Sequence, residues 1–168
     1  IGLLVDETLY DISSLSPSHD TLNVLHTLQM MSPAQLEEVK AKASTFKLSD
    51  VHLNSPIKNP SKVVAAPINY KAHVEEMQSN GQAFGHIITD IRKAGLFLKA
   101  PSSVVGASDG IKQRFLDRRT DHEIELCAVI GKAASGVSKE NALDYVAGYC
   151  LGLDITVRGS EDRRSEER

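Results

Sequence analysis

Two stretches in which apolar and polar residues alternate constrain the fold most, residues 122–131 and 146–158. Successive side chains of a β-strand point to opposite faces, so each stretch would present one apolar and one polar face. Glu123 and Glu125 share the polar face of the first stretch, and Asp154 lies on the polar face of the second. The alternation therefore predicts two amphipathic strands that carry acidic side chains away from the core.

Glu123 and Glu125 become close neighbours in such a strand. Two partly buried carboxylates repel each other, and the usual remedy is a shared proton or a cation. If both strands lie in one sheet, Asp154 completes a Glu-Glu-Asp set of oxygen ligands that suits a hard divalent ion. The alternative is that both glutamates face water on an edge strand, as polar residues of alternating strands commonly do.

Arg158 lies on the same predicted face as Asp154 and could bind a substrate carboxylate through two hydrogen bonds. The alternative is a surface Asp–Arg pair, which contributes little stability. Lys99 ends the apolar run 95–98, where it is either a site residue or a lysine that extends its ammonium group into water.

His73 and Glu76 are three residues apart on a short helix predicted between residues 69 and 78. At this spacing their side chains point the same way, and a carboxylate behind an imidazole raises its basicity. The pair could therefore activate a water molecule as a general base. The alternative is that both residues lie on an exposed helix surface without a catalytic role.

The N-terminal part predicts a hairpin over residues 2–12 and two helices, of which the second begins with a capping box at Ser32, Pro33 and Gln35. Prolines and asparagines between residues 54 and 61 mark a linker, so we predict a small N-terminal segment over residues 1–58 and the main domain over 59–168. Further strands are expected at residues 63–66 and 95–99, and a short helix near residues 138–145.

Composition excludes several classes of protein. The charge of −3, from 19 Lys and Arg against 22 Asp and Glu, offers no basic surface for nucleic acid. No apolar run approaches the roughly 18 residues needed to cross a membrane. The two cysteines, Cys127 and Cys150, form no C-x-x-C pair, so we expect reduced thiols in a cytoplasmic protein.

Four motifs occur in succession between residues 62 and 158. They are Asn69-Tyr70 with His73, Gly95-Leu-Phe-Leu-Lys99, Asp121-His-Glu-Ile-Glu-Leu126 running into Val129-Ile-Gly-Lys132, and Ala142-Leu-Asp-Tyr-Val-Ala-Gly-Tyr149 ending in Asp154 and Arg158. In order and number these motifs resemble the fumarylacetoacetate hydrolase family. The resemblance implies an α+β fold with a mixed β-roll and a homodimer.

The same resemblance implies a role for each candidate residue. These are Glu123, Glu125 and Asp154 as ligands of Mg²⁺ or Mn²⁺, His73 and Glu76 as the dyad that deprotonates water, and Lys99 and Arg158 as residues facing the substrate. The implied function is metal-dependent hydrolysis of a carbon–carbon bond in acylpyruvate-like oxo-acids, in aromatic catabolism. The alternatives are an oxaloacetate decarboxylase, an isomerase or hydratase of the same family, or a catalytically silent dimerising module.

The sequence departs from the family pattern in three places. Ala66 precedes Pro67 where many members have a glycine, and Gly159 comes after Arg158 where many have an aspartate. The later strands, a further lysine and a Gly-Thr-Pro loop of the family are absent after residue 158, and the chain begins at Ile1 rather than methionine. We therefore expect the chain to be an incomplete part of a longer protein.

Overall fold

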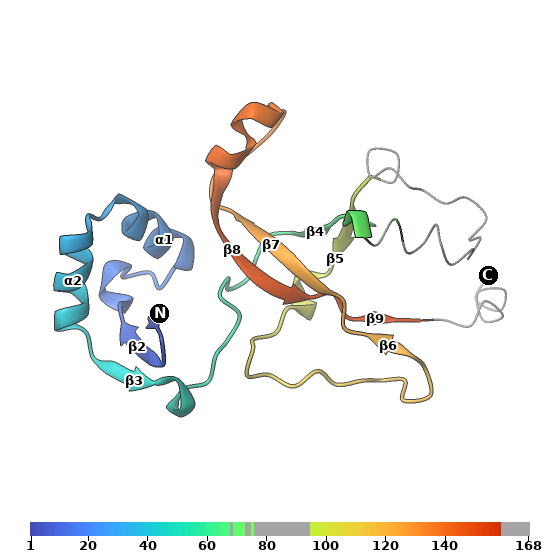
Figure 1. The fold of residues 1–168 in the computed structure, drawn as a ribbon, viewed down its shortest axis with the longest axis horizontal. Coiled ribbons are helices and arrows are strands. Elements are labelled where there is room, and N and C mark those ends of the chain that lie inside the picture. The colour runs from blue at the N-terminus through green and yellow to red at the C-terminus, as the bar shows by residue number, and fades with distance from the viewer. Residues whose placement is uncertain (68, 73–74, 76–94, 159–168) are drawn as a thin grey trace. The chain divides into compact units, whose positions relative to one another are not determined.

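The computed structural model describes residues 1–67, 69–72, 75 and 95–158 (Figure 1). These residues combine helices with antiparallel strands, which confirms the predicted α+β class. The chain divides into two compact units, one formed by Ile1–Leu53 with Ser108–Arg168 and the other by Asn54–Ala107. The domain boundary near Lys58 stays a prediction.

The predicted N-terminal hairpin is confirmed. Strands β1 (Gly2–Val5) and β2 (Thr8–Asp11) pair antiparallel around Asp6, which adopts a left-handed backbone with φ 52°. A third strand, β3 (Thr45–Lys47), pairs with β2 and was not predicted, because three residues are too short for a visible alternation. The N-terminal sheet therefore has the strand order β1-β2-β3.

Two helices come after the hairpin, as the periodicity predicts. Helix α1 (Thr21–Met30) is capped by Asp20, whose carboxylate accepts a hydrogen bond from the Leu22 amide at 2.9 Å. Helix α2 (Pro33–Lys42) has the predicted capping box between Ser32 and Gln35 and proline in its first turn. Satisfying these amide groups fixes where each helix begins.

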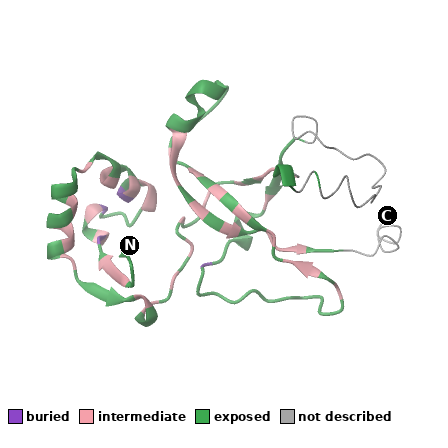
Figure 2. Ribbon diagram, in the orientation of Figure 1, coloured by how far each residue is buried: buried purple, intermediate pink, exposed green. Residues whose placement is uncertain are grey.

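Ile12 and Val24 form the small apolar core beside the N-terminal sheet, with 1% and 2% of their surface exposed (Figure 2). Among the described residues they are the apolar side chains that are fully buried. Helix α1 also contacts strand β8 (Val146–Leu153) through Gln29, whose amide donates to the Ala147 carbonyl at 2.9 Å.

The two strands predicted from the alternation pair with each other. Strand β7 (Ile124–Ile130) is antiparallel to β8, and a 3₁₀ helix over Lys139–Tyr145 connects them. Beyond this ladder, β6 (Thr120–Asp121) pairs with β9 (Thr156–Val157). The register is continuous from the β7–β8 ladder to the β6–β9 ladder, because the Asp154 amide donates to the Glu123 carbonyl at 2.9 Å between them.

Both strands are shorter than the sequence predicts. Glu123 has φ 33°, a left-handed value that is unfavourable for a residue with a side chain and interrupts the extended backbone. On the other strand the break falls between Leu153, the last residue of β8, and Thr156. The long ladder is therefore split in two at the acidic residues Glu123 and Asp154.

The apolar face of β7 and β8 remains exposed. Leu126 is 62% and Leu151 73% exposed, and the register places them opposite each other. Figure 2 shows the alternation along both strands, in which exposed positions are apolar and half-buried positions belong to the other face. The described residues thus leave the apolar face of this hairpin open.

In the other unit, β4 (Val63–Ala65) pairs antiparallel with β5 (Phe97–Lys99), and Lys99 lies opposite Val63. Both strands were predicted at these positions. Most of the helix predicted over residues 69–78 lies outside the described residues.

Candidate metal and substrate site

The face of β7 and β8 opposite the exposed apolar residues carries the candidate acidic groups. Glu125 lies opposite Gly152, and both are half-buried. Glu123 and Asp154 lie opposite each other two residues further along the hairpin, where the Asp154 amide donates to the Glu123 carbonyl. Local alternation and strand pairing together therefore bring the backbones of the three predicted ligands to the same end of the hairpin.

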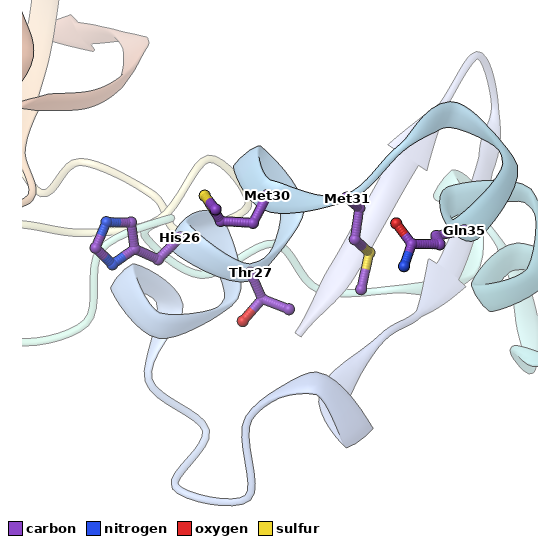
Figure 3. A pocket seen from close by; sticks show the side chains of 5 residues that line it. All are labelled: His26, Thr27, Met30, Met31 and Gln35. Atoms are coloured by element: carbon purple, nitrogen blue, oxygen red, sulfur yellow. The ribbon is translucent and has the colours of Figure 1, made fainter.

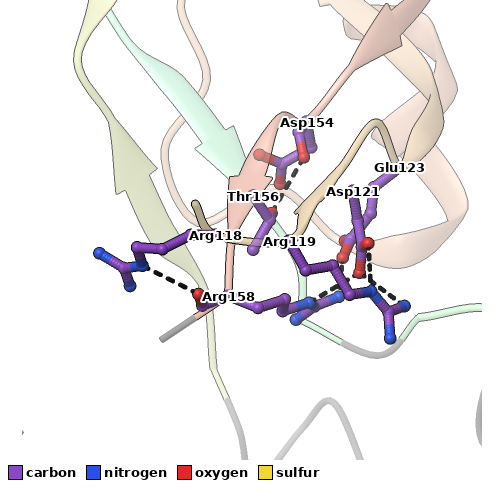
Figure 4. A network of polar contacts seen from close by, with 7 residues as sticks. All are labelled: Arg118, Arg119, Asp121, Glu123, Asp154, Thr156 and Arg158. Atoms are coloured by element: carbon purple, nitrogen blue, oxygen red, sulfur yellow. Dashed lines mark hydrogen bonds and ion pairs between the residues drawn. The ribbon is translucent and has the colours of Figure 1, made fainter. Parts of the chain in front are cut away.

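The carboxylates themselves do not converge in this structure. Within the part of the chain that is described, no three side chains of His, Cys, Asp or Glu are placed to share a metal ion. The Glu123 carboxylate instead forms an ion pair with the Nη2 atom of Arg158 (Figure 4). The left-handed backbone at Glu123 accompanies this arrangement.

Asp121 is the centre of the polar network in Figure 4. Arg119 donates two hydrogen bonds to its carboxylate, at 2.7 and 3.0 Å, and the Nε atom of Arg158 donates a third at 2.8 Å. Hydrogen bonds from Arg119, and then from Arg158, lower the pKa of Asp121 below its usual value. Asp121 thus remains a carboxylate that holds Arg158 beside Glu123.

Sequence reasoning did not single out Asp121. The available signal was its spacing, because Asp121, Glu123 and Glu125 occupy every second position. For Arg158, the structure shows pairing with acidic side chains, although with Asp121 and Glu123 rather than with Asp154. The Arg158 side chain is 47% exposed.

Asp154 lies where β8 ends. Its Oδ1 atom is buried from solvent, and its backbone carbonyl accepts a hydrogen bond from the Thr156 hydroxyl at 3.0 Å. A buried carboxylate oxygen beside two further carboxylate residues is the donor chemistry that Mg²⁺ and Mn²⁺ prefer. The residue types at this end of the hairpin therefore fit such an ion, although their side chains are not gathered around one point.

Cys127 and Cys150 occupy the same face as Glu125, opposite each other in the register. Neither is in a disulfide, and both are half-buried. Burial raises the pKa of the Cys127 thiol, and the neighbouring Cys150 thiol raises it further. The reduced state of both thiols stays a prediction.

The remaining predicted site residues are His73, Glu76 and Lys99. His73 and Glu76 lie outside the described residues. Lys99 ends β5 in the unit formed by Asn54–Ala107, where it is half-buried. The roles of these three residues stay predictions.

An opening between α1 and α2, with a volume of about 540 Å³, is lined by His26, Thr27, Met30, Met31 and Gln35 (Figure 3). Met30 in this opening is 83% exposed. In Figure 3 the labelled side chains spread along the helices rather than around one point. The opening therefore offers no set of groups for catalysis.

A family profile described as "Fumarylacetoacetate (FAA) hydrolase C-terminal" matches residues 62–167. The chain belongs to the fumarylacetoacetate hydrolase family. It is 47% identical over 133 residues to a maleylpyruvate hydrolase from Aquipseudomonas alcaligenes, covering 77% of this chain and 46% of that protein. It is 33% identical over 145 residues to the oxaloacetate tautomerase YisK from Bacillus subtilis, covering 85% of this chain and 46% of that protein.

Solved structures of the fumarylacetoacetate hydrolase family have similar folds. Maleylpyruvate hydrolase from Sphingobium sp. SYK-6, in complex with manganese(II) and pyruvate, superposes with a TM-score of 0.71 at 27% identity, covering 97% of this chain and 58% of that one. A fumarylacetoacetate hydrolase from Exiguobacterium antarcticum superposes with a TM-score of 0.65 at 28% identity, covering 99% of this chain and 54% of that one. The chain thus spans about half the length of these relatives. No helix among the described residues is both long and apolar enough to cross a membrane.

Proposed function

We propose that the full-length protein is a metal-dependent hydrolase that cleaves a carbon–carbon bond in an acylpyruvate of the maleylpyruvate type. The observation that carries this proposal is the 47% identity to a maleylpyruvate hydrolase. The acidic and basic residues at one end of the β7–β8 hairpin support it, because an oxo-acid substrate needs both a cation and an anion-binding group.

Glu123, Glu125 and Asp154 would hold Mg²⁺ or Mn²⁺ in the full-length protein. The chemistry supplied by a bound ion is Lewis-acid polarisation of the 2-oxo carboxylate and of the enolate that remains after bond cleavage. To serve as a ligand, the Glu123 carboxylate must leave Arg158. The half-buried Glu125 and the buried Oδ1 atom of Asp154 are already screened from bulk water.

Arg158 would bind the substrate carboxylate. When Glu123 turns toward a cation, the Nη2 group of Arg158 loses its partner and can donate to the substrate instead. Asp121 keeps the Nε atom of Arg158 in place through a 2.8 Å hydrogen bond. We therefore assign Asp121 as a positioning residue that orients the guanidinium without touching the substrate.

His73 and Glu76 would supply the general base. The imidazole would accept a proton from water, and the carboxylate would fix the tautomer and raise the basicity of the ring. Lys99 would face the substrate from the end of β5, where an ammonium group stabilises a developing oxyanion. These roles come from the family motifs in the sequence.

The proposal extends to the architecture. In the full-length protein the main domain, which includes residues 59–168, would form a mixed β-roll, and residues 1–58 would form a small N-terminal segment. The exposed apolar face of β7 and β8 is consistent with a sheet that other elements cover. We further propose a cytoplasmic homodimer that acts in aromatic catabolism and binds neither nucleic acid nor membrane.

The test is turnover of maleylpyruvate by the purified full-length protein, with pyruvate measured as product in the presence of Mn²⁺, Mg²⁺ or a chelator. We expect pyruvate with either ion and none with the chelator. A folded protein without turnover under all conditions would favour the catalytically silent alternative.

A second candidate is an enzyme that acts on oxaloacetate, supported by the 33% identity to an oxaloacetate tautomerase. The same protein should then interconvert the keto and enol forms of oxaloacetate, or decarboxylate it, faster than it releases pyruvate from maleylpyruvate. Measuring both substrates at matched concentrations separates the two candidates.

A further inference from the structure

Cys127 and Cys150 are directly opposite each other on β7 and β8. They lie on the same face of the hairpin, because the register continues from Glu125 opposite Gly152 by two residues on each strand. Both are half-buried, so a small molecule can reach them while the two strands restrict their motion. Neither residue has a role in the proposed reaction.

The backbone geometry suits a covalent bond between the two sulfurs. Residues opposite each other in antiparallel strands have Cα atoms about 4.5 or about 5.5 Å apart, depending on the hydrogen-bond pattern. Disulfides span Cα distances of about 4.4–6.8 Å, so both patterns are within range.

Gly152 leaves room for the Cys127 sulfur. A Cβ atom built on Gly152 would lie 2.7 Å from Cys127 Sγ, which is closer than real atoms approach. The absent side chain at position 152 thus provides the space that the Cys127 sulfur occupies on this face of the hairpin.

We propose that Cys127 and Cys150 are a thiol–disulfide exchange site that closes a reversible disulfide across β7 and β8. The oxidant is a small-molecule disulfide such as oxidised glutathione. One cysteine thiolate attacks the oxidant, forms a mixed disulfide and releases one glutathione; the second cysteine attacks the mixed disulfide and releases the other. The two protein thiols give up two protons and two electrons, and two glutathione thiols are formed.

This site is independent of the proposed hydrolase activity. Its consequence for the hairpin is mechanical, because a bond between residues 127 and 150 would prevent any slip of the register that places Glu125 opposite Gly152. A dithiol reductant would reverse it.

The experiment uses the full-length protein with and without oxidised glutathione, followed by alkylation of remaining thiols and digestion with trypsin. Cleavage after Arg119, Lys132, Lys139 and Arg158 places the cysteines in separate peptides, 120–132 and 140–158. After oxidation, we expect both cysteines to escape alkylation. The two peptides should then be recovered as one disulfide-linked species. Treatment with dithiothreitol should release them.

Two variants test the geometry. Cys127→Ser should leave Cys150 as a stable mixed disulfide with glutathione, because no second thiol can resolve it. The double variant Cys150→Ser with Tyr149→Cys moves the thiol to the opposite face, so it should not link to Cys127. Circular dichroism of each variant establishes that the fold is retained.

Three results would overturn the proposal. In the first, both thiols are still fully alkylated after treatment that oxidises a control dithiol. In the second, the linkage occurs only between chains, seen as a dimer on a non-reducing gel. In the third, the cysteine introduced at position 149 in the double variant links to Cys127 as readily as Cys150 does in the unmodified protein.

Discussion

Gly131, directly after β7, has no room for a methyl group, whereas Gly148 in β8 does. A Cβ atom on Gly131 would lie 2.7 Å from the Cβ of Ala147 and 3.5 Å from its Cα, atoms that cannot rotate away. A Cβ atom on Gly148 would meet no heavy atom within 4 Å. Replacing each glycine by alanine therefore tests the packing that sets the register of the hairpin carrying Glu125.

The two substitutions should change the free energy of unfolding in opposite directions. Overpacking costs about 1–3 kcal/mol, and restricting the unfolded chain by Gly→Ala recovers about 0.4–1 kcal/mol. Gly131→Ala should therefore destabilise by roughly 1.3 kcal/mol, the difference between the midpoints of these two ranges. Gly148→Ala lacks the packing cost and should stabilise by about 0.4–1 kcal/mol.

Urea unfolding of the full-length protein, followed by circular dichroism, measures both effects. Gly131→Ala should lower the urea midpoint and Gly148→Ala should keep or raise it. In both variants the slope of the unfolding free energy against urea concentration should be unchanged. If Gly131→Ala were as stable as the unmodified protein, or Gly148→Ala the less stable variant, the packing of Gly131 on Ala147 would be wrong. The assigned register of β7 and β8 would then have to be revised.

Three further predictions concern the proposed site. Glu125→Ala should weaken Mn²⁺ binding in calorimetry because one carboxylate ligand is removed, and an unchanged affinity would contradict its role. His73→Ala should lower kcat by about 10²–10⁴ while metal affinity stays constant, and near-normal turnover would exclude it as the general base. Because the pKa of Asp121 is lowered from 3.8, its stabilising contribution is present above that value and lost as pH falls through the folded-state pKa. As the pH is lowered from about 5 toward 3, the urea midpoint should therefore fall less steeply in Asp121→Asn than in the unmodified protein. An identical dependence on pH would argue against the network.

Elements set by neighbouring residues were predicted well. The capping box at Ser32 and Gln35 and the hairpin around Asp6 both appear where the sequence places them. Capping depends on side chains that reach amides two or three residues away, and a hairpin depends on the turn between its strands. Such interactions can be recognised in a short window of sequence.

The third strand of the N-terminal sheet shows the opposite case. β3 (Thr45–Lys47) is paired with β2, more than thirty residues earlier in the chain. Its three residues carry no alternation long enough to indicate a strand. Only the partner strand makes it extended, so local sequence could not reveal it.

The sequence by itself determined that Glu123, Glu125 and Asp154 lie on polar strand faces, because the period of two in a β-strand arises from the stereochemistry of the backbone. It did not determine which residues face each other, since a slip of one residue changes every cross-strand neighbour. Tertiary structure decided that Arg158 contacts Asp121 and Glu123 and that Cys127 lies opposite Cys150. These contacts join residues 23 to 37 positions apart and exist only once two strands have paired in one register.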